Sequence, residues 1–131
     1  PNMKKIILIL SMLLIFMVGC TTNTYQNINS REFNELLSDE EVFVIDVHIP
    51  EQEHIEGTDA IIPYNEIENY ATSLPKDKNT KIAVYCRSGS MSAESSQKLI
   101  DLGYKNVFNL EGGRNAYVAE FEQWLGTLKK S

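Results

Sequence analysis

Two continuous apolar runs constrain the fold of this chain more than any other feature of its sequence. The first extends from Val42 to Val47, is interrupted only by Asp46, and consists mostly of β-branched residues. The second extends from Lys81 to Tyr85 and is apolar from Ile82 onward. Runs of this kind, without polar alternation, are typical of strands buried on both faces of a sheet. They predict two central strands covered on both sides.

Shorter elements lie around these two runs. Ser30 is the predicted N-cap of a helix over 31–37, and Asn65 is the predicted cap of a brief helix over 66–70. Strands alternating with helices indicate βα units around a mostly parallel sheet, so we expect an α/β fold. The remaining predicted elements are strands over 60–62 and 107–110 and helices over 93–102 and 115–125.

Cys86 directly follows the second apolar run and opens a loop of small residues before the helix predicted over 93–102. Backbone N–H groups of such a loop, aided by the helix dipole, can stabilise an anion and lower the pKa of a thiol. Open parallel sheets bind ligands beyond the carboxyl ends of their strands. The segment 46–48 and the Gly112-Gly113 turn are predicted at the same edge. Cys86 is therefore the candidate nucleophile; the alternative is a buried cysteine that only packs.

The N-terminal residues are predicted to lie outside this domain. Pro1 and Asn2 precede the first methionine and are interpreted as a cloning remnant. The basic pair Lys4-Lys5 followed by the apolar stretch 6–18 is typical of an export signal and short for a membrane-spanning helix. We therefore expect a signal peptide over 1–19.

Met17-Val18-Gly19-Cys20 resembles a bacterial lipobox, in which the chain is cut before the cysteine and the thiol carries a lipid. We expect a lipidated Cys20, a polar tether over 20–27, and a single domain over 28–128. This places the protein on the outer face of the bacterial cytoplasmic membrane or in the periplasm. An uncleaved anchor and an ordinary signal peptide remain alternatives.

The excess of acidic residues limits the kinds of partner that this domain is expected to bind. The chain has 12 basic and 18 acidic residues, and loss of residues 1–19 would remove two lysines and no acid. Nucleic acid is excluded as an expected partner because phosphate contacts need a basic face. Any membrane attachment is expected to come from the lipid alone. The domain is expected to be a monomer.

The cysteine count also bears on function. The chain has two cysteines, so a lipidated Cys20 would leave Cys86 as the only free thiol in an oxidising compartment. Cys86 could then form no internal disulfide. A lone thiol in such a compartment favours a chemical role.

Three motifs of this chain are similar to those of one known family, the rhodaneses. They run from Asp46 to Gly57, from Ile82 to Gly89 and from Leu110 to Tyr117, in rhodanese order and spacing. Together the resemblance covers residues 27–125. It implies a rhodanese-like fold, with a central mostly parallel sheet flanked by helices.

The resemblance also implies a function. Cys86 would be the sulfur-carrying nucleophile of a sulfurtransferase, cradled by a loop made of Arg87, Ser88, Gly89, Ser90, Met91 and Ser92. It would take a sulfane sulfur from a donor such as thiosulfate, hold it as a persulfide, and pass it to a thiol, to cyanide or to a protein cysteine. The resemblance implies no cofactor and no metal.

The sequence departs from the family pattern near this loop. Met91 stands where many members carry Arg, His48 replaces the usual Arg after Asp-Val, and Glu53 replaces the usual Gly before His-Ile. The segment 57–63 is one residue longer than the pattern. These departures affect the expected donor rather than the expected fold.

Several neighbours of Cys86 allow two interpretations. Asp46 is interpreted as a buried residue that hydrogen-bonds neighbouring loops, with a general base as the alternative. His54 lies in a His-Ile pair that resembles the family motif and is interpreted as holding its loop together; metal binding is not expected, since no other His or Cys ligands accompany it. His48 is interpreted as an exposed loop residue, with titration beside the site as the alternative. Arg87 either attracts anions or points to solvent.

Two other classes of protein are compared with the sulfurtransferase. Cysteine-based phosphatases need an Arg six residues after the nucleophile to clamp phosphate, and that position here is Ser92. Ser92 is interpreted instead as a small residue that also caps the helix. A non-catalytic or redox-sensing module, in which Cys86 is modified by peroxide or a partner thiol, stays open.

Overall fold

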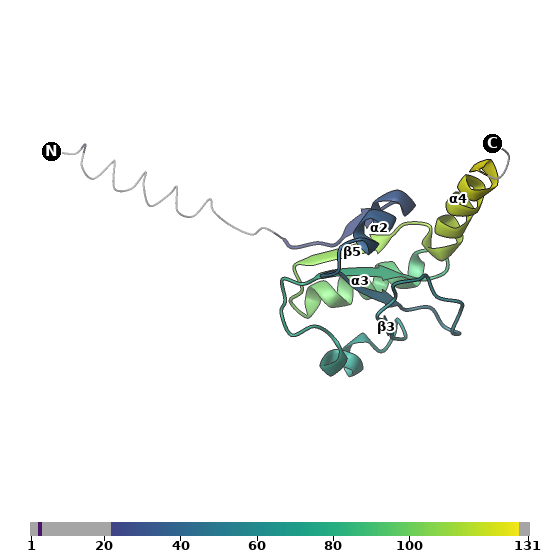
Figure 1. Ribbon diagram of the computed structural model, residues 1–131. Coiled ribbons are helices and arrows are strands. Elements are labelled where there is room, and N and C mark those ends of the chain that lie inside the picture. Colours follow the sequence, from purple (N-terminus) through teal and green to yellow (C-terminus); the bar gives the residue numbers. More distant parts are fainter. Residues whose placement is uncertain (1–2, 4–21, 129–131) are drawn as a thin grey trace.

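A five-stranded, entirely parallel sheet forms the centre of the molecule in a computed structural model that describes Met3 and residues 22–128 (Figure 1). The strand order is β1-β5-β4-β2-β3, so β4 is the middle strand. The expected α/β fold is confirmed. The strands are β1 (Gln26–Ile28), β2 (Phe43–Asp46), β3 (Ala60–Ile61), β4 (Lys81–Tyr85) and β5 (Asn106–Leu110).

Helices cover both faces of this sheet. The helices α2 and α4 contact each other over one face, and α3 contacts the 3-10 helix η1 over the other (Figure 1). Their bounds are α2 (Ser30–Leu37), η1 (Ile67–Ser73), α3 (Ser90–Asp101) and α4 (Gly113–Leu128). Within the described residues, no helix is both long enough and apolar enough to cross a membrane.

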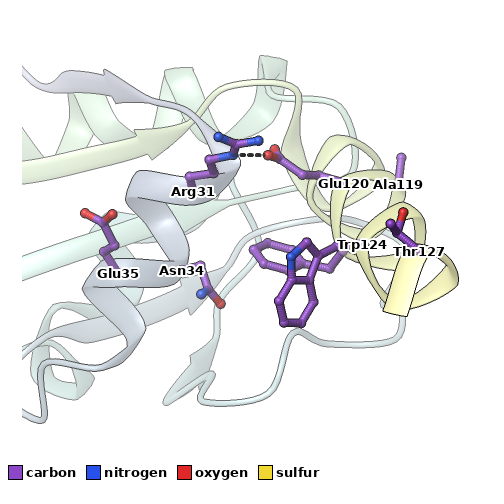
Figure 2. Close-up of a pocket in the computed structure, with 8 residues that line it drawn as sticks. Arg31, Asn34, Glu35, Ala119, Glu120, Trp124 and Thr127 are labelled. Carbon is purple, nitrogen blue, oxygen red and sulfur yellow. Dashed lines mark hydrogen bonds and ion pairs between the residues drawn. The ribbon is translucent and has the colours of Figure 1, made fainter. Parts of the chain in front are cut away.

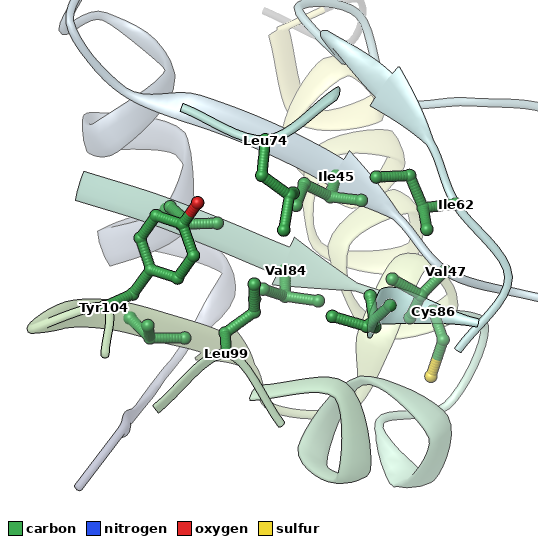
Figure 3. Packing of buried hydrophobic residues seen from close by; sticks show 11 residues of the cluster. Ile45, Val47, Ile62, Leu74, Val84, Cys86, Leu99 and Tyr104 are labelled. Atoms are coloured by element: carbon green, nitrogen blue, oxygen red, sulfur yellow. The ribbon is translucent and has the colours of Figure 1, made fainter. Parts of the chain in front are cut away.

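The two apolar runs predicted to be central strands are the neighbours β2 and β4. Their register pairs Phe43 with Ile82 and Asp46 with Tyr85. Side chains alternate between faces along a strand, so Ile82, Val84 and the following Cys86 lie in the core beneath α3. Figure 3 shows Cys86 at one end of this cluster. Tyr85 packs in the opposite core, against Phe33 of α2.

The N-terminal edge of the sheet differs from the expected domain boundary. Residues 20–27 were predicted to form a tether, but Gln26 and Asn27 belong to β1, which pairs with β5. Side chains of this edge strand are exposed except for Ile28, which explains why no apolar pattern marked it. The expected signal peptide, the lipobox and Cys20 lie outside the described residues.

Helix starts also differ from the predictions by a few residues. Asn29, not Ser30, is the N-cap of α2, and it forms a capping box with Glu32. Helix α3 begins at Ser90 rather than 93, because Gly89 takes the N-cap position with a φ of 108°. Ser92 therefore lies inside the first turn and is not a cap. Similarly, η1 has no side-chain cap from Asn65, and α4 begins at Gly113 rather than 115.

Candidate active site

Cys86 lies at the carboxyl end of β4, where the chain turns into the loop that starts α3. Its side chain is almost fully buried, with 1% of its surface exposed. The backbone N–H of Gly89 donates a hydrogen bond to its Sγ over 3.0 Å. This contact requires the loop to fold back on itself, and the positive φ of Gly89 allows that.

Ser92 provides the second contact to the sulfur. Its Oγ lies 3.4 Å from Cys86 Sγ and 3.1 Å from the carbonyl oxygen of Gly89, and its single proton can turn from that carbonyl to the sulfur when the sulfur is a thiolate. Burial alone would raise the pKa of the Cys86 thiol. The Ser92 hydroxyl and the backbone N–H groups of Ser92, Gly89 and Ser88 outweigh burial, so the pKa of Cys86 is lowered. The site therefore raises the fraction of Cys86 that is present as thiolate, which is the reactive form of cysteine.

The other residues of the loop are arranged differently. The side chains of Arg87, Ser88 and Ser90 are exposed, and none of them contacts Sγ through a side-chain hydrogen bond that the structure records. Met91 is half-buried and packs against the cluster that contains Cys86. The loop thus holds the sulfur with backbone N–H groups and one hydroxyl.

Gly112 and Gly113 press against the base of this loop. The N–H of Arg114 donates to the carbonyl of Cys86 over 2.8 Å, and the N–H of Asn115 donates to the carbonyl of Arg87 over 3.0 Å. A Cβ on Gly113 would lie 2.5 Å from the carbonyl oxygen of Arg87. The start of α4 is therefore joined to the backbone of the nucleophile, and only glycine fits between them.

Asp46 organises the loop that follows β2. Its carboxylate is buried and accepts hydrogen bonds from the N–H of His48, from Gln52 Nε2 and from His54 Nδ1. His54 Nε2 also lies 3.1 Å from Glu51, and both contacts raise the pKa of His54. These contacts agree with the interpretation of Asp46 and His54 as residues that hold loops together.

The side chain of His48 is more buried than predicted. His48 was predicted to be an exposed loop residue, but its side chain is half-buried, and its Nε2 is buried without a hydrogen-bond partner among the described residues. Burial lowers the pKa of His48, and the nearby positive charge of Arg87 lowers it further. His48 is therefore held close to Arg87 in a neutral form at neutral pH.

Tyr85 and Arg114 also hold the loops of the site, although no sequence pattern pointed to either of them. The Tyr85 hydroxyl accepts a hydrogen bond from the N–H of Ile55 and lies 2.8 Å from Thr58 Oγ1, so it fastens the loop after β2 from the opposite face. Burial raises the pKa of Tyr85 to about 12. Arg114 forms an ion pair with Glu53 over 2.6 Å. The position of Tyr85 next to Cys86 was the only available signal for the first contact.

A groove between α2 and α4 lies away from these loops (Figure 2). The ion pair between Arg31 and Glu120 crosses it, and Trp124 is exposed beside it. None of its lining residues belongs to the loops around Cys86. The described residues also contain no cluster of His, Cys, Asp or Glu that could hold a metal ion.

A small parallel α/β domain with a thiolate-stabilising loop after its middle strand is the architecture of a rhodanese. Residues 29–120 match the rhodanese-like domain family, and the chain belongs to that family. The crystal structure of a rhodanese-related protein from Thermoplasma volcanium is similar, with a TM-score of 0.62 and 29% identity over 73% of this chain and 93% of that one.

Named sulfurtransferases are among the relatives. The chain is 42% identical over 72 residues to the thiosulfate sulfurtransferase PspE of Escherichia coli (strain K12), covering 52% of this chain and 67% of PspE. It is 34% identical over 90 residues to a sulfurtransferase of Allochromatium vinosum, covering 66% of this chain and 81% of that protein. It also matches tRNA uridine(34) hydroxylases, of whose length it spans about a third.

Proposed function

We propose that this protein is a sulfurtransferase that carries a sulfane sulfur as a persulfide on Cys86. The observation that supports it most is the buried Sγ held by the N–H of Gly89 and by Ser92 at the start of α3. The same groups that stabilise a thiolate would stabilise an anionic persulfide, as an oxyanion hole does for developing charge. The sulfurtransferases among its relatives support the same chemistry.

The reaction would have two steps. The Cys86 thiolate attacks the outer sulfur of the donor, a new S–S bond forms, and the bond to that sulfur in the donor breaks with its electron pair leaving on the donor. A thiophilic acceptor then attacks the outer sulfur of the Cys86 persulfide and releases the thiolate. A thiol, a protein cysteine or, in assays, cyanide would serve as acceptor. No oxidant or reductant is consumed.

Intact mass spectrometry tests this proposal on the full chain. Incubation with thiosulfate or with glutathione persulfide is expected to make the protein one sulfur atom heavier, and cyanide is expected to remove that atom as thiocyanate. Cys86→Ser is expected to abolish the gain, whereas Cys20→Ser, the matched change at the other cysteine, is expected to retain it. A wild-type chain that gains no sulfur from either donor would contradict the proposal. Oxidation by peroxide without sulfur transfer would favour the redox-sensing module.

We also propose that the protein is exported and anchored through a lipid on Cys20. The support is the sequence: Lys4-Lys5, the apolar stretch 6–18 and the lipobox-like Met17-Val18-Gly19-Cys20. Labelling of bacterial cells with a tagged fatty acid is expected to mark the wild-type chain and not Cys20→Ala. An unmarked wild-type chain recovered from the cytoplasm would contradict this location.

A further inference from the structure

We infer, on the basis of the function proposed above, that the donor that loads Cys86 is an organic persulfide rather than thiosulfate. The inference rests on the charges that surround the nucleophile. Thiosulfate is a compact dianion, and its binding and the departure of sulfite both place two negative charges next to the thiolate. A site that accepts it needs cations close to the sulfur, because like charges at this separation repel strongly in a partly buried pocket.

Neutral groups hold the sulfur of Cys86. The contacts recorded for Sγ come from the N–H of Gly89 and from Ser92 Oγ. Within the loop 87–92, Arg87 is the only charged residue, and its side chain is exposed. Half-buried Met91 lies beside Ser92 in the first turn of α3 and offers only an apolar surface. The loop can therefore stabilise one negative charge through dipoles but offers little to a second.

Arg114, the other basic residue described near the loop, is paired with a carboxylate through one nitrogen, while its Nε is buried without a hydrogen-bond partner among the described residues. Arg114, whose N–H donates to the carbonyl of Cys86, forms a 2.6 Å ion pair with Glu53. Glu111 adds an exposed carboxylate between β5 and the Gly112-Gly113 turn. The Glu53 carboxylate thus offsets part of the positive charge that Arg114 brings to the carboxyl edge of the sheet.

His48 does not supply the missing charge. It lies close enough to Arg87 for the two to affect each other electrostatically, and its Nε2 is buried without a partner among the described residues. A buried imidazole beside a guanidinium favours the neutral state. At neutral pH the loop after β2 therefore presents a neutral ring toward Arg87 instead of a second cation.

An organic persulfide suits this arrangement because it brings at most one negative charge to the reacting atoms. The Cys86 thiolate attacks its outer sulfur, the S–S bond of the donor breaks, and the electron pair leaves on the organic thiolate. That thiolate takes up the proton of the transferred persulfide, leaving an anionic Cys86 persulfide and a neutral thiol. With thiosulfate, by contrast, the leaving group is the sulfite dianion.

The experiment compares single-turnover loading of Cys86 by two donors, followed by intact mass on the full chain in mild detergent. The donors are thiosulfate and the persulfide of 2-mercaptoethanol, whose carbon skeleton is uncharged. We expect the wild-type chain to be loaded at least about tenfold faster by the persulfide at equal concentration. Met91→Arg is expected to raise the ratio of the thiosulfate rate to the persulfide rate by about tenfold, a factor equal to about 1.4 kcal/mol.

Ser38→Arg is the matched control, because it adds the same charge at an exposed position on the turn after α2, before the amino end of β2. It is expected to leave both rates unchanged. His48→Arg gives the same test as Met91→Arg from the neighbouring loop, should Met91→Arg fail to fold. Loading of the wild-type chain by thiosulfate as fast as by the persulfide, or a ratio of the two rates that neither variant changes, would overturn the inference. Either result would leave the proposed sulfurtransferase function standing. Loading by neither donor would overturn the proposed function itself.

Discussion

Ser92 Oγ lies 3.4 Å from Cys86 Sγ and 3.1 Å from the carbonyl oxygen of Gly89, so its single proton can be donated to the carbonyl beside a neutral thiol and to the sulfur beside a thiolate. The hydroxyl thus joins the nucleophile to the residue whose N–H also contacts the sulfur. This small ring of contacts depends on α3 beginning at Ser90, since only then does Ser92 fall in the first turn and face the strand end.

Removing this hydroxyl should make Cys86 less reactive. In Ser92→Ala the pKa of the thiol is expected to rise, because the Ser92 hydroxyl is among the groups that lower it. We expect alkylation of Cys86 by iodoacetamide at neutral pH to slow by roughly three- to tenfold. The measurement is the pH dependence of alkylation of the Cys86 peptide. Ser95→Ala, which removes a buried hydroxyl bonded to the carbonyl of Met91, should leave that profile in place.

Gly113→Ala should destabilise the fold at the active site. The added Cβ would lie 2.5 Å from the backbone of Arg87, at a residue with a φ of 61°. We expect a loss of about 2–4 kcal/mol in the free energy of unfolding, measured by urea denaturation. Gly103→Ala is the control, because its φ is 98° but no atom lies within 4 Å of the added Cβ. It should cost only about 1–2 kcal/mol, and equal losses would contradict the proposed clash.

The two histidines should make the stability of the protein depend on pH in opposite directions. The pKa of His54 is raised from 6.5, so its stabilising contribution is present below that value and is lost as the pH rises through its folded-state pKa. The pKa of His48 is lowered from 6.5, so stability is lost instead as the pH falls below 6.5. Urea unfolding of His54→Gln and His48→Gln across this range should show differences from the wild-type chain that diverge in opposite directions.

Tyr85→Phe should loosen the loop after β2. The hydroxyl accepts from the buried N–H of Ile55, and its loss would leave that group unsatisfied at a cost of about 1–3 kcal/mol. The expected local result is faster hydrogen exchange at the Ile55 amide. Tyr104→Phe also removes a buried tyrosine hydroxyl, one that donates to the carbonyl of Pro75. It should lower stability without a selective effect on the Ile55 amide.

The parts of the fold that were predicted correctly have strong local signals. The runs that became β2 and β4 are apolar except for Asp46 and Lys81, and Cys86 follows one of them directly. Helix α3 ends at Asp101, one residue before its predicted end, and Gly103 follows with a positive φ. In each case the residue type itself carries the structural requirement, so no knowledge of tertiary contacts was needed.

The parts that were missed depend on contacts between distant segments. Strand β1 is polar and exists because β5 provides a paired edge, while the buried Nε2 of His48 depends on how the loop after β2 packs near Arg87. The role of Tyr85 depends on the path of the loop after β2, because Ile55, the residue whose N–H it binds, lies 30 residues earlier in the chain. No local pattern encodes such partners.

The burial of Cys86 has a consequence for the regiochemistry of sulfur release. In a persulfide the outer sulfur would occupy the path by which a donor reaches Sγ, and the rest of the residue is buried, with 1% exposed, so an incoming thiol would meet the outer sulfur. Attack there delivers the sulfur and regenerates the enzyme. Attack on the inner sulfur would instead release hydrogen sulfide and leave the acceptor trapped as a mixed disulfide. The burial of Cys86 thus favours transfer of the sulfur to the acceptor over formation of a mixed disulfide.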